Sequence, residues 1–192
     1  MFEPNIKSII QESINTKLLI IEDDVLVKKI STAAEKCIHA FNHDHKILFC
    51  GNGGSAADAQ HLAAEFSGRF YKDRPPLYSE ALHTNTSYLT AVGNDYGYDF
   101  VYSRLINGIG KSGDILFGLS TSGNSTNILK AFEAAKEKGM LCIAMTGKSG
   151  GKMAALADLL INVPSIDTPR IQESHITIGH IICEMVEKTL FP

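Results

Sequence analysis

The segment KILFCGNGGSAADAQHLAAEFSGR, residues 46–69, contains a short apolar run, a glycine-rich loop and a helical pattern in that order. The apolar run at 46–50 has the length of a buried strand, and the glycines that follow it end the strand. Residues 56–69 then show the spacing of a helix. A strand, a tight loop and a helix form the repeating unit of parallel α/β folds, so this segment decides the fold class.

The same pattern recurs outward from this segment. DILFGLS (114–120) and LCIAMT (141–146) resemble the first strand, SEALH (79–83) and LLINV (159–163) are weaker candidates, and helical patterns occupy 96–107, 125–138 and 170–190. Short buried strands that alternate with helices predict a five-stranded parallel sheet in a doubly wound, flavodoxin-like or Rossmann-like α/β fold. Ligands bind such sheets at the carboxyl ends of the strands, so we expect the site in the loops after residues 50, 83, 120 and 146.

The length of 192 residues fits one domain, which we expect to span 1–192. Its α/β core is expected over 46–192, and residues 1–45 form an N-terminal helical segment. Within that segment, residues 4–42 have helical spacing and predict a helical hairpin before the first strand. Such a hairpin cannot bury both of its sides against one sheet, so we expect it to pack on a partner subunit.

Composition and charge exclude several classes of partner. The formal net charge is -3, which is not the electrostatic signature of a nucleic-acid-binding protein. The N-terminus lacks a signal-peptide pattern, and no uncharged stretch approaches the roughly 20 residues that span a bilayer. The four cysteines stand among apolar neighbours, as buried thiols do in a reducing compartment. We therefore expect a cytoplasmic protein that binds neither nucleic acid nor a membrane.

Two loops between a strand and a helix have the composition of ligand sites. The glycine loop, Gly51–Ser55, permits close backbone approach to a ligand, and we expect Ser55 to cap the next helix. The serine loop, Ser120–Ser125, carries four hydroxyls, which favour a phosphate at the N-terminus of the following helix. Because the serine loop contains no Lys or Arg, it suits a phosphate monoester better than a nucleoside triphosphate. The alternatives are a tight structural turn and a plain helix cap.

Other polar residues have weaker signals. The tripeptide Gly93-Asn94-Asp95 is a turn signal that, beside the two loops, also suits sugar hydroxyls. His61 and Glu65 share a helical stripe with Asp58 and Arg69, where they either share a metal ion or form part of a solvated face. On the last helix His180 lies nearly opposite Ile178, so it is expected to face outward unless another subunit covers it.

Five motifs together resemble the sugar isomerase (SIS) domain family, and within it the phosphoheptose isomerases. They are CGNGGSAADAQHLAAEFSGR (50–69), VGNDYG (92–97), GLSTSGNS (118–125), TGKSGGKM (146–153) and RIQESHITIGH (170–180), and the resemblance covers nearly the whole chain. It implies a homotetramer that converts sedoheptulose 7-phosphate to D-glycero-D-manno-heptose 7-phosphate, the first step toward the heptose of the lipopolysaccharide core. The family also implies one zinc ion per active site.

The resemblance implies roles for individual residues. The zinc ligands correspond to His61, Glu65, Gln172 and His180, and we take Glu65 and His180 as the candidate catalytic residues. The substrate-binding positions are Asn52, Gly53, Gly54, Ser55, Glu65, Arg69, Asn94, Asp95, Ser120, Thr121, Ser122, Ser125 and Gln172. Some members of the family have an aspartate before the arginine that matches Arg170, whereas this chain has Pro169 there.

A related group within this fold family binds the bacterial replication initiator protein and has lost catalysis. The C-terminal sequence TLFP resembles that group, so an inactive binding protein is the alternative function. A sugar-phosphate sensor without turnover is a third. The presence of Glu65, His180 and the complete serine loop favours the isomerase. Helix spacing places Ser55 and Glu65 about 15 Å apart, which predicts active sites shared between subunits.

Overall fold

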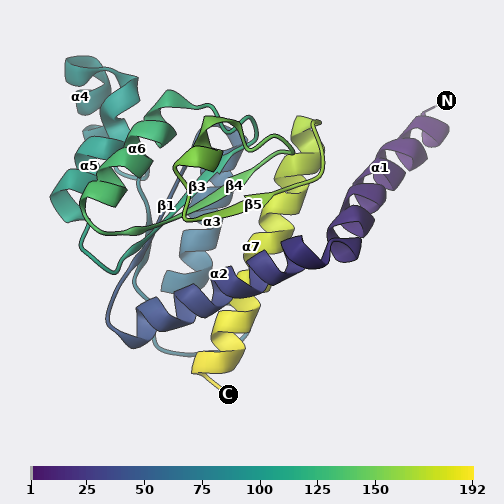
Figure 1. Ribbon diagram of the computed structural model, residues 1–192, viewed down its shortest axis with the longest axis horizontal. Coiled ribbons are helices and arrows are strands. Elements are labelled where there is room, and N and C mark those ends of the chain that lie inside the picture. The colour runs from purple at the N-terminus through teal and green to yellow at the C-terminus, as the bar shows by residue number, and fades with distance from the viewer. Residues whose placement is uncertain (1) are drawn as a thin grey trace.

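The computed structural model describes residues 2–192, and five parallel strands form its single sheet. The strands are β1 (Ile47–Gly51), β2 (Ser79–Ala81), β3 (Ile115–Ser120), β4 (Leu141–Thr146) and β5 (Leu159–Asn162). Their order across the sheet is β2-β1-β3-β4-β5, and every neighbouring pair is parallel (Figure 1). The predicted five-stranded parallel sheet is therefore confirmed.

Helices cover both faces of the sheet. They are α1 (Glu3–Glu22), α2 (Asp24–Asn42), α3 (Gly54–Ser67), α4 (Thr86–Tyr96), α5 (Val101–Ile109), α6 (Thr126–Glu137) and α7 (Thr168–Leu190), with short 3₁₀ helices η1 (Tyr98–Phe100) and η2 (Gly151–Ala155). One core cluster joins the sheet to α2, α3 and α7, and the other joins it to α4, α5 and α6. Because alternate side chains enter opposite clusters, the strands read as continuous apolar runs.

The two N-terminal helices follow one another almost end to end. A single residue, Asp23, connects them, and its side chain accepts a hydrogen bond from the N–H of Leu26 at 3.0 Å. Antiparallel helices need a connection of two to five residues, so α1 does not fold back along α2 as in the expected hairpin. Figure 1 shows α1 projecting away from the body of the molecule, where several apolar side chains are exposed: Ile6, Ile9, Ile10, Ile14, Leu18 and Leu19.

The segment between β2 and β3 differs from the prediction. A helix was expected over 96–107 and a turn at 93–95, but Asn94 and Asp95 lie near the end of α4. Asn85 starts this helix by accepting a hydrogen bond from the N–H of Tyr88 at 3.0 Å. The chain leaves α4 at Gly97, whose φ of 91° suits glycine, and η1 follows before α5. A side-chain cap and the burial of Val92 thus outweigh the local turn signal.

The start of α3 also differs from the expectation. Gly53, with a φ of 54°, is the N-cap residue and provides no side-chain cap, so Ser55 is not the capping residue. Ser55 lies buried in the first turn instead. A Cβ atom on Gly51 would lie 2.3 Å from the carbonyl oxygen of Ser55, so only glycine fits where β1 turns into α3. Pro169 occupies the first turn of α7, where proline is well tolerated.

A buried histidine connects α7 to the sheet. The Nε2 atom of His175 lies 3.2 Å from the carbonyl oxygen of Thr146, at the carboxyl end of β4. His175 is fully buried, and this burial lowers its pKa from 6.5 to about 4, although the bond to Thr146 opposes the change. The imidazole is therefore neutral in the folded protein at neutral pH.

This burial predicts a pH-dependent free energy of unfolding. The folded-state pKa lies below the unfolded value, so the stabilisation is complete above pH 6.5 and decreases as the pH falls toward 4. Between pH 7 and pH 4.5 we expect His175 to lower the free energy of unfolding by roughly 2 kcal/mol. Urea unfolding of the wild type and of His175→Gln at both pH values measures this decrease. Equal losses in the two proteins would contradict the assignment.

Candidate functional site

The glycine loop and the serine loop lie side by side because β1 and β3 are neighbours in the sheet. Two side-chain amides join the glycine loop to the start of α6, which follows the serine loop. The Nδ2 of Asn52 donates to the Oδ1 of Asn127 on α6, and the Nδ2 of Asn127 donates to the Oδ1 of Asn52, both at 2.9 Å. Asn127 is buried and was not among the predicted site residues. No sequence signal beyond its place after the serine loop indicates this role.

The serine loop is held from two sides. The hydroxyls of Ser120 and Ser125 lie 3.1 Å apart, and the N–H of Gly147 donates to the carbonyl oxygen of Thr121 at 3.0 Å. A Cβ atom on Gly123 would lie 2.1 Å from the carbonyl oxygen of Gly150, so the loop packs directly on the segment that follows β4. Ser125 is also the N-cap residue of α6, whose N-terminus favours an anion at this loop.

Three other predicted substrate contacts stand apart. Asn94 and Asp95 are exposed at the end of α4, where the Nδ2 of Asn94 donates to the Oδ1 of Asp95 at 2.9 Å. Arg69 is exposed just beyond the end of α3. The structure does not bring these three residues together with the two loops through any hydrogen bond among the described residues, so their roles remain predictions.

His61, Glu65 and His180 form a compact group, which we name the His–Glu–His group. The Nε2 of His61 lies 3.1 Å from the Oε1 of Glu65 on α3 and 2.9 Å from the Nε2 of His180 on α7. His180 was expected to face outward unless a partner covered it, but it lies half-buried against α3 of its own chain. The helical wheel could not show this, because a second helix of the same layer flanks α7.

A glycine explains how α3 and α7 come so close. A Cβ atom on Gly179 would lie 2.4 Å from the Cδ2 of Leu62, so the two helices are in contact where α7 has no side chain. The next residue along α7 is His180, and the residue before Leu62 on α3 is His61. The close approach of Gly179 and Leu62 therefore brings the two imidazoles together.

The His–Glu–His group could hold a metal ion. One donor atom from each residue lies within 4.8 Å of the other two, and two imidazoles with a carboxylate are a common zinc donor set. The Nε2 of the fourth predicted ligand, Gln172, would be 2.7 Å from a Cβ atom on Gly54, and its part in holding a metal stays a prediction. Gly54 precedes His61 by seven residues, about 10 Å along the helix, so Gln172 lies beside the glycine loop.

Asp58 precedes His61 by almost one turn on the same stripe of α3. Its carboxylate is partly buried, and the Oδ2 atom has no hydrogen-bond partner among the described residues. Burial raises the pKa of this carboxyl group, and the nearby His61 partly opposes the change. Asp58 thus adds a carboxyl group of raised pKa to the same side of α3.

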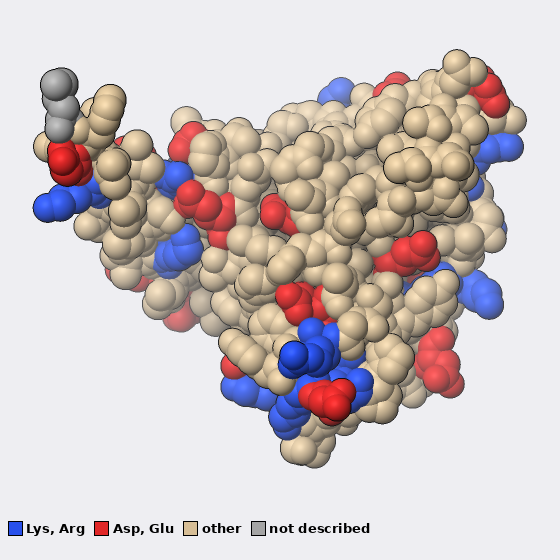
Figure 2. Space-filling view, turned by 180° about the vertical axis from the view of Figure 1, so that it is seen from behind, with Lys and Arg blue, Asp and Glu red and all other residues tan. Residues whose placement is uncertain are grey.

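The surface carries charges of both signs. On the face seen in Figure 2, Lys and Arg side chains lie beside Asp and Glu side chains, with wide uncharged areas between them. No helix among residues 2–192 is both long and apolar enough to cross a bilayer. The four cysteines are free and buried, as expected from their apolar neighbours.

Known proteins match this chain over nearly its whole length. The family model for the SIS domain matches residues 12–147. A phosphoheptose isomerase from Aneurinibacillus thermoaerophilus is 58% identical over 186 residues, which cover 97% of this chain and 94% of that protein.

Solved structures give the same result. The structure of the phosphoheptose isomerase GmhA from Neisseria gonorrhoeae has a TM-score of 0.92 and 45% identity, covering 98% of this chain and 100% of that one. A phosphoheptose isomerase from Francisella tularensis has a TM-score of 0.93 and 34% identity, covering 98% and 99%. The chain therefore belongs to the SIS domain family and, within it, to the phosphoheptose isomerases.

Proposed function

We propose that this protein converts sedoheptulose 7-phosphate to D-glycero-D-manno-heptose 7-phosphate, an aldose–ketose isomerisation. The observation that carries the proposal is the meeting of His180 with His61 and Glu65, 119 and 115 residues apart in sequence, within one chain whose relatives are phosphoheptose isomerases. A carboxylate and an imidazole at such distances can move two protons on neighbouring atoms of a sugar.

The reaction needs two proton transfers. A base takes a proton from C1 and returns it to C2, and a second group moves the proton between the two oxygens as the enediolate forms and collapses. Glu65 serves as the base at carbon and His180 serves at oxygen. A zinc ion held by His61, Glu65 and His180 would supply Lewis-acid polarisation of the substrate carbonyl. Tight coordination would weaken a carboxylate as a base, so either Glu65 is held loosely or part of the base role passes to His180.

The two loops bind the rest of the substrate. Ser120, Thr121, Ser122 and Ser125 hold the phosphate, assisted by the N-terminus of α6. The sugar hydroxyls are bound by the remaining predicted contacts: Asn52, Gly53, Gly54, Ser55, Arg69, Asn94, Asp95 and Gln172. The reciprocal bonds between Asn52 and Asn127 support this division, since they fix the glycine loop against α6.

The active site is completed by a second copy of the chain. Ser55 and Glu65 are ten residues apart on α3, about 15 Å, a distance that a seven-carbon sugar phosphate can barely span. The exposed apolar side chains of α1 provide surface for assembly. We propose that each chain is one domain and that four chains form a homotetramer. The N-terminal segment of each chain, residues 1–45, packs against a neighbouring subunit. The enzyme works in the cytoplasm, on the path to the heptose of lipopolysaccharide, without nucleic-acid or membrane partners.

Incubation of the purified protein with sedoheptulose 7-phosphate tests the function. Aldose should form, and added zinc should raise the rate.

Glu65→Gln keeps the shape of the side chain but cannot accept a proton, so its kcat should fall by roughly 10²-fold or more. His180→Gln should lose activity similarly, and calorimetry should show weaker zinc binding in both variants. Failure of the zinc-loaded wild type to form aldose would contradict the function, and full activity of Glu65→Gln would remove Glu65 as the base.

The phosphate role of the serine loop gives a second prediction. Changing Ser120, Ser122 and Ser125 together to alanine removes hydrogen bonds to a charged group, each worth about 1.5–3 kcal/mol. We expect a strong increase in KM with an unchanged circular dichroism spectrum. Ser112→Ala, at the amino end of β3, is the control and should keep its KM. An unchanged KM in the triple variant would place the phosphate elsewhere.

A further inference from the structure

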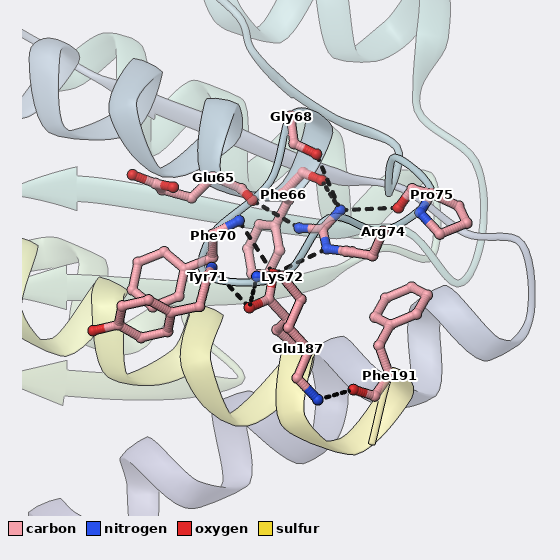
Figure 3. Close-up of polar contacts among 10 residues, drawn as sticks. All are labelled: Glu65, Phe66, Gly68, Phe70, Tyr71, Lys72, Arg74, Pro75, Glu187 and Phe191. Atoms are coloured by element: carbon pink, nitrogen blue, oxygen red, sulfur yellow. Dashed lines mark hydrogen bonds and ion pairs between the residues drawn. The ribbon is translucent and has the colours of Figure 1, made fainter.

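A buried ion pair connects the segment after α3 to the last turns of α7. The Nε of Arg74 lies 3.2 Å from the Oε2 of Glu187, and both side chains are almost inaccessible to solvent, at 2% and 3% exposure. Figure 3 shows the pair between the end of α3 and α7, with the backbone of residues 70–72 folded around the carboxylate. Neither residue belongs to the motifs that identify the family.

Arg74 binds the end of α3. Its Nη2 donates to the carbonyl oxygen of Glu65 at 2.8 Å, and its Nη1 donates to that of Phe66 at 2.7 Å (Figure 3). Nη1 also lies 3.0 Å from the carbonyl oxygen of Pro75. The last carbonyls of a helix have no partner within the helix and attract positive charge. The guanidinium therefore holds the backbone of Glu65 itself.

Glu187 binds the segment that leaves α3. Its carboxylate accepts hydrogen bonds from the N–H groups of Phe70, Tyr71 and Lys72, at 3.1, 2.8 and 2.9 Å. Burial raises the pKa of this carboxyl group, but the bonds from these N–H groups and from Arg74 outweigh it and leave the pKa below its usual value. The carboxylate is therefore charged and fully engaged, which fixes residues 70–72 to α7.

The two ends of this connection carry the predicted catalytic residues. Arg74 bonds the carbonyl of Glu65, and Glu187 follows His180 by seven residues, two turns along the same helix. The contact of Gly179 with Leu62 fixes the two helices three residues before Glu65, and Arg74 and Glu187 fix the end of α3 beyond it. We propose that Arg74 and Glu187 are positioning residues that set the Glu65 carboxylate at its distance from His61 and His180.

Stability alone gives a weaker account of this pair. The cost of desolvating two buried charges often equals the gain from pairing them, so a buried ion pair is poor evidence of stabilisation. The planar guanidinium of arginine reaches several acceptors in one fixed arrangement, which the single amine of lysine cannot do. Arg74→Lys thus retains the positive charge but loses most of the hydrogen bonds to the carbonyls. The variant therefore separates the effect of positioning from the effect of charge.

A second buried carboxylate in this chain supplies a matched control. Asp114 accepts hydrogen bonds from the N–H groups of Lys46 and Lys111 and pairs with the Lys46 amine at 2.5 Å. It is as buried as Glu187, but its partners precede β1 and β3 instead of joining α3 to α7. Asp114→Asn should therefore lower the melting temperature without altering the His–Glu–His group.

The experiment compares Arg74→Lys, Asp114→Asn and the wild type as full-length proteins. The first readout is the set of imidazole ¹H–¹⁵N signals of His61 and His180 in the metal-free protein, assigned with single His→Gln variants. Zinc affinity by calorimetry and the kinetics with sedoheptulose 7-phosphate follow. In Arg74→Lys we expect shifted imidazole signals and a roughly 10–100-fold loss of zinc affinity and kcat. KM should stay within about twofold, because the loops are unchanged.

Unchanged imidazole signals, zinc affinity and kcat in Arg74→Lys would overturn the proposal, as would equal effects in Asp114→Asn. If Arg74→Lys does not fold, Glu187→Asp tests the same link, since its shorter side chain withdraws from the amides of 70–72. If neither folds while Asp114→Asn does, the pair acts in folding, and the positioning role is rejected. The kinetic part rests on the proposed function, which the wild type tests by itself, whereas the imidazole signals decide the positioning independently.

Discussion

The rigid length of α3 is the constraint on which the arrangement of the site depends. Its first turn belongs to the glycine loop, which is bonded to α6 through Asn52 and Asn127. Its last turns carry Glu65, ten residues after Ser55, and a helix cannot shorten the resulting distance of about 15 Å. Under the proposed function, the glycine loop would bind the sugar and Glu65 would move its proton, so one chain offers both groups to a single small substrate only with difficulty.

The proposed symmetric assembly would resolve this separation, because symmetry can bring one end from each of two chains together. The surface is suited to assembly. Besides the exposed face of α1, a groove of about 420 Å³ lies between α1, α2 and α7, and apolar side chains such as Ile20, Ile30 and Ile181 line it. Within each chain, the contact of Gly179 with Leu62 keeps α3 and α7 together, so both helices would enter the proposed assembly as one unit.

Local sequence predicted those parts of the fold that local patterns determine. Short apolar runs identified β1, β3 and β4, and β2 and β5 were found as weaker candidates. The helix α4 was missed because its cap, Asn85, outweighs a turn signal. The position of His180 depends on a glycine that admits a neighbouring helix. Arg74 and Glu187 are 113 residues apart, and each alone has the appearance of an ordinary surface charge.

Subunit mixing tests the central claim, that one substrate is processed by residues of two chains, most directly. An inactive Glu65→Gln protein is combined with an inactive variant of the serine loop, Ser120→Ala with Ser122→Ala and Ser125→Ala, under conditions that exchange subunits. Shared sites predict that isomerase activity returns, since some mixed assemblies contain a site with both halves intact. No recovery after native mass spectrometry has demonstrated exchange would mean that each chain builds its own site and would contradict the account.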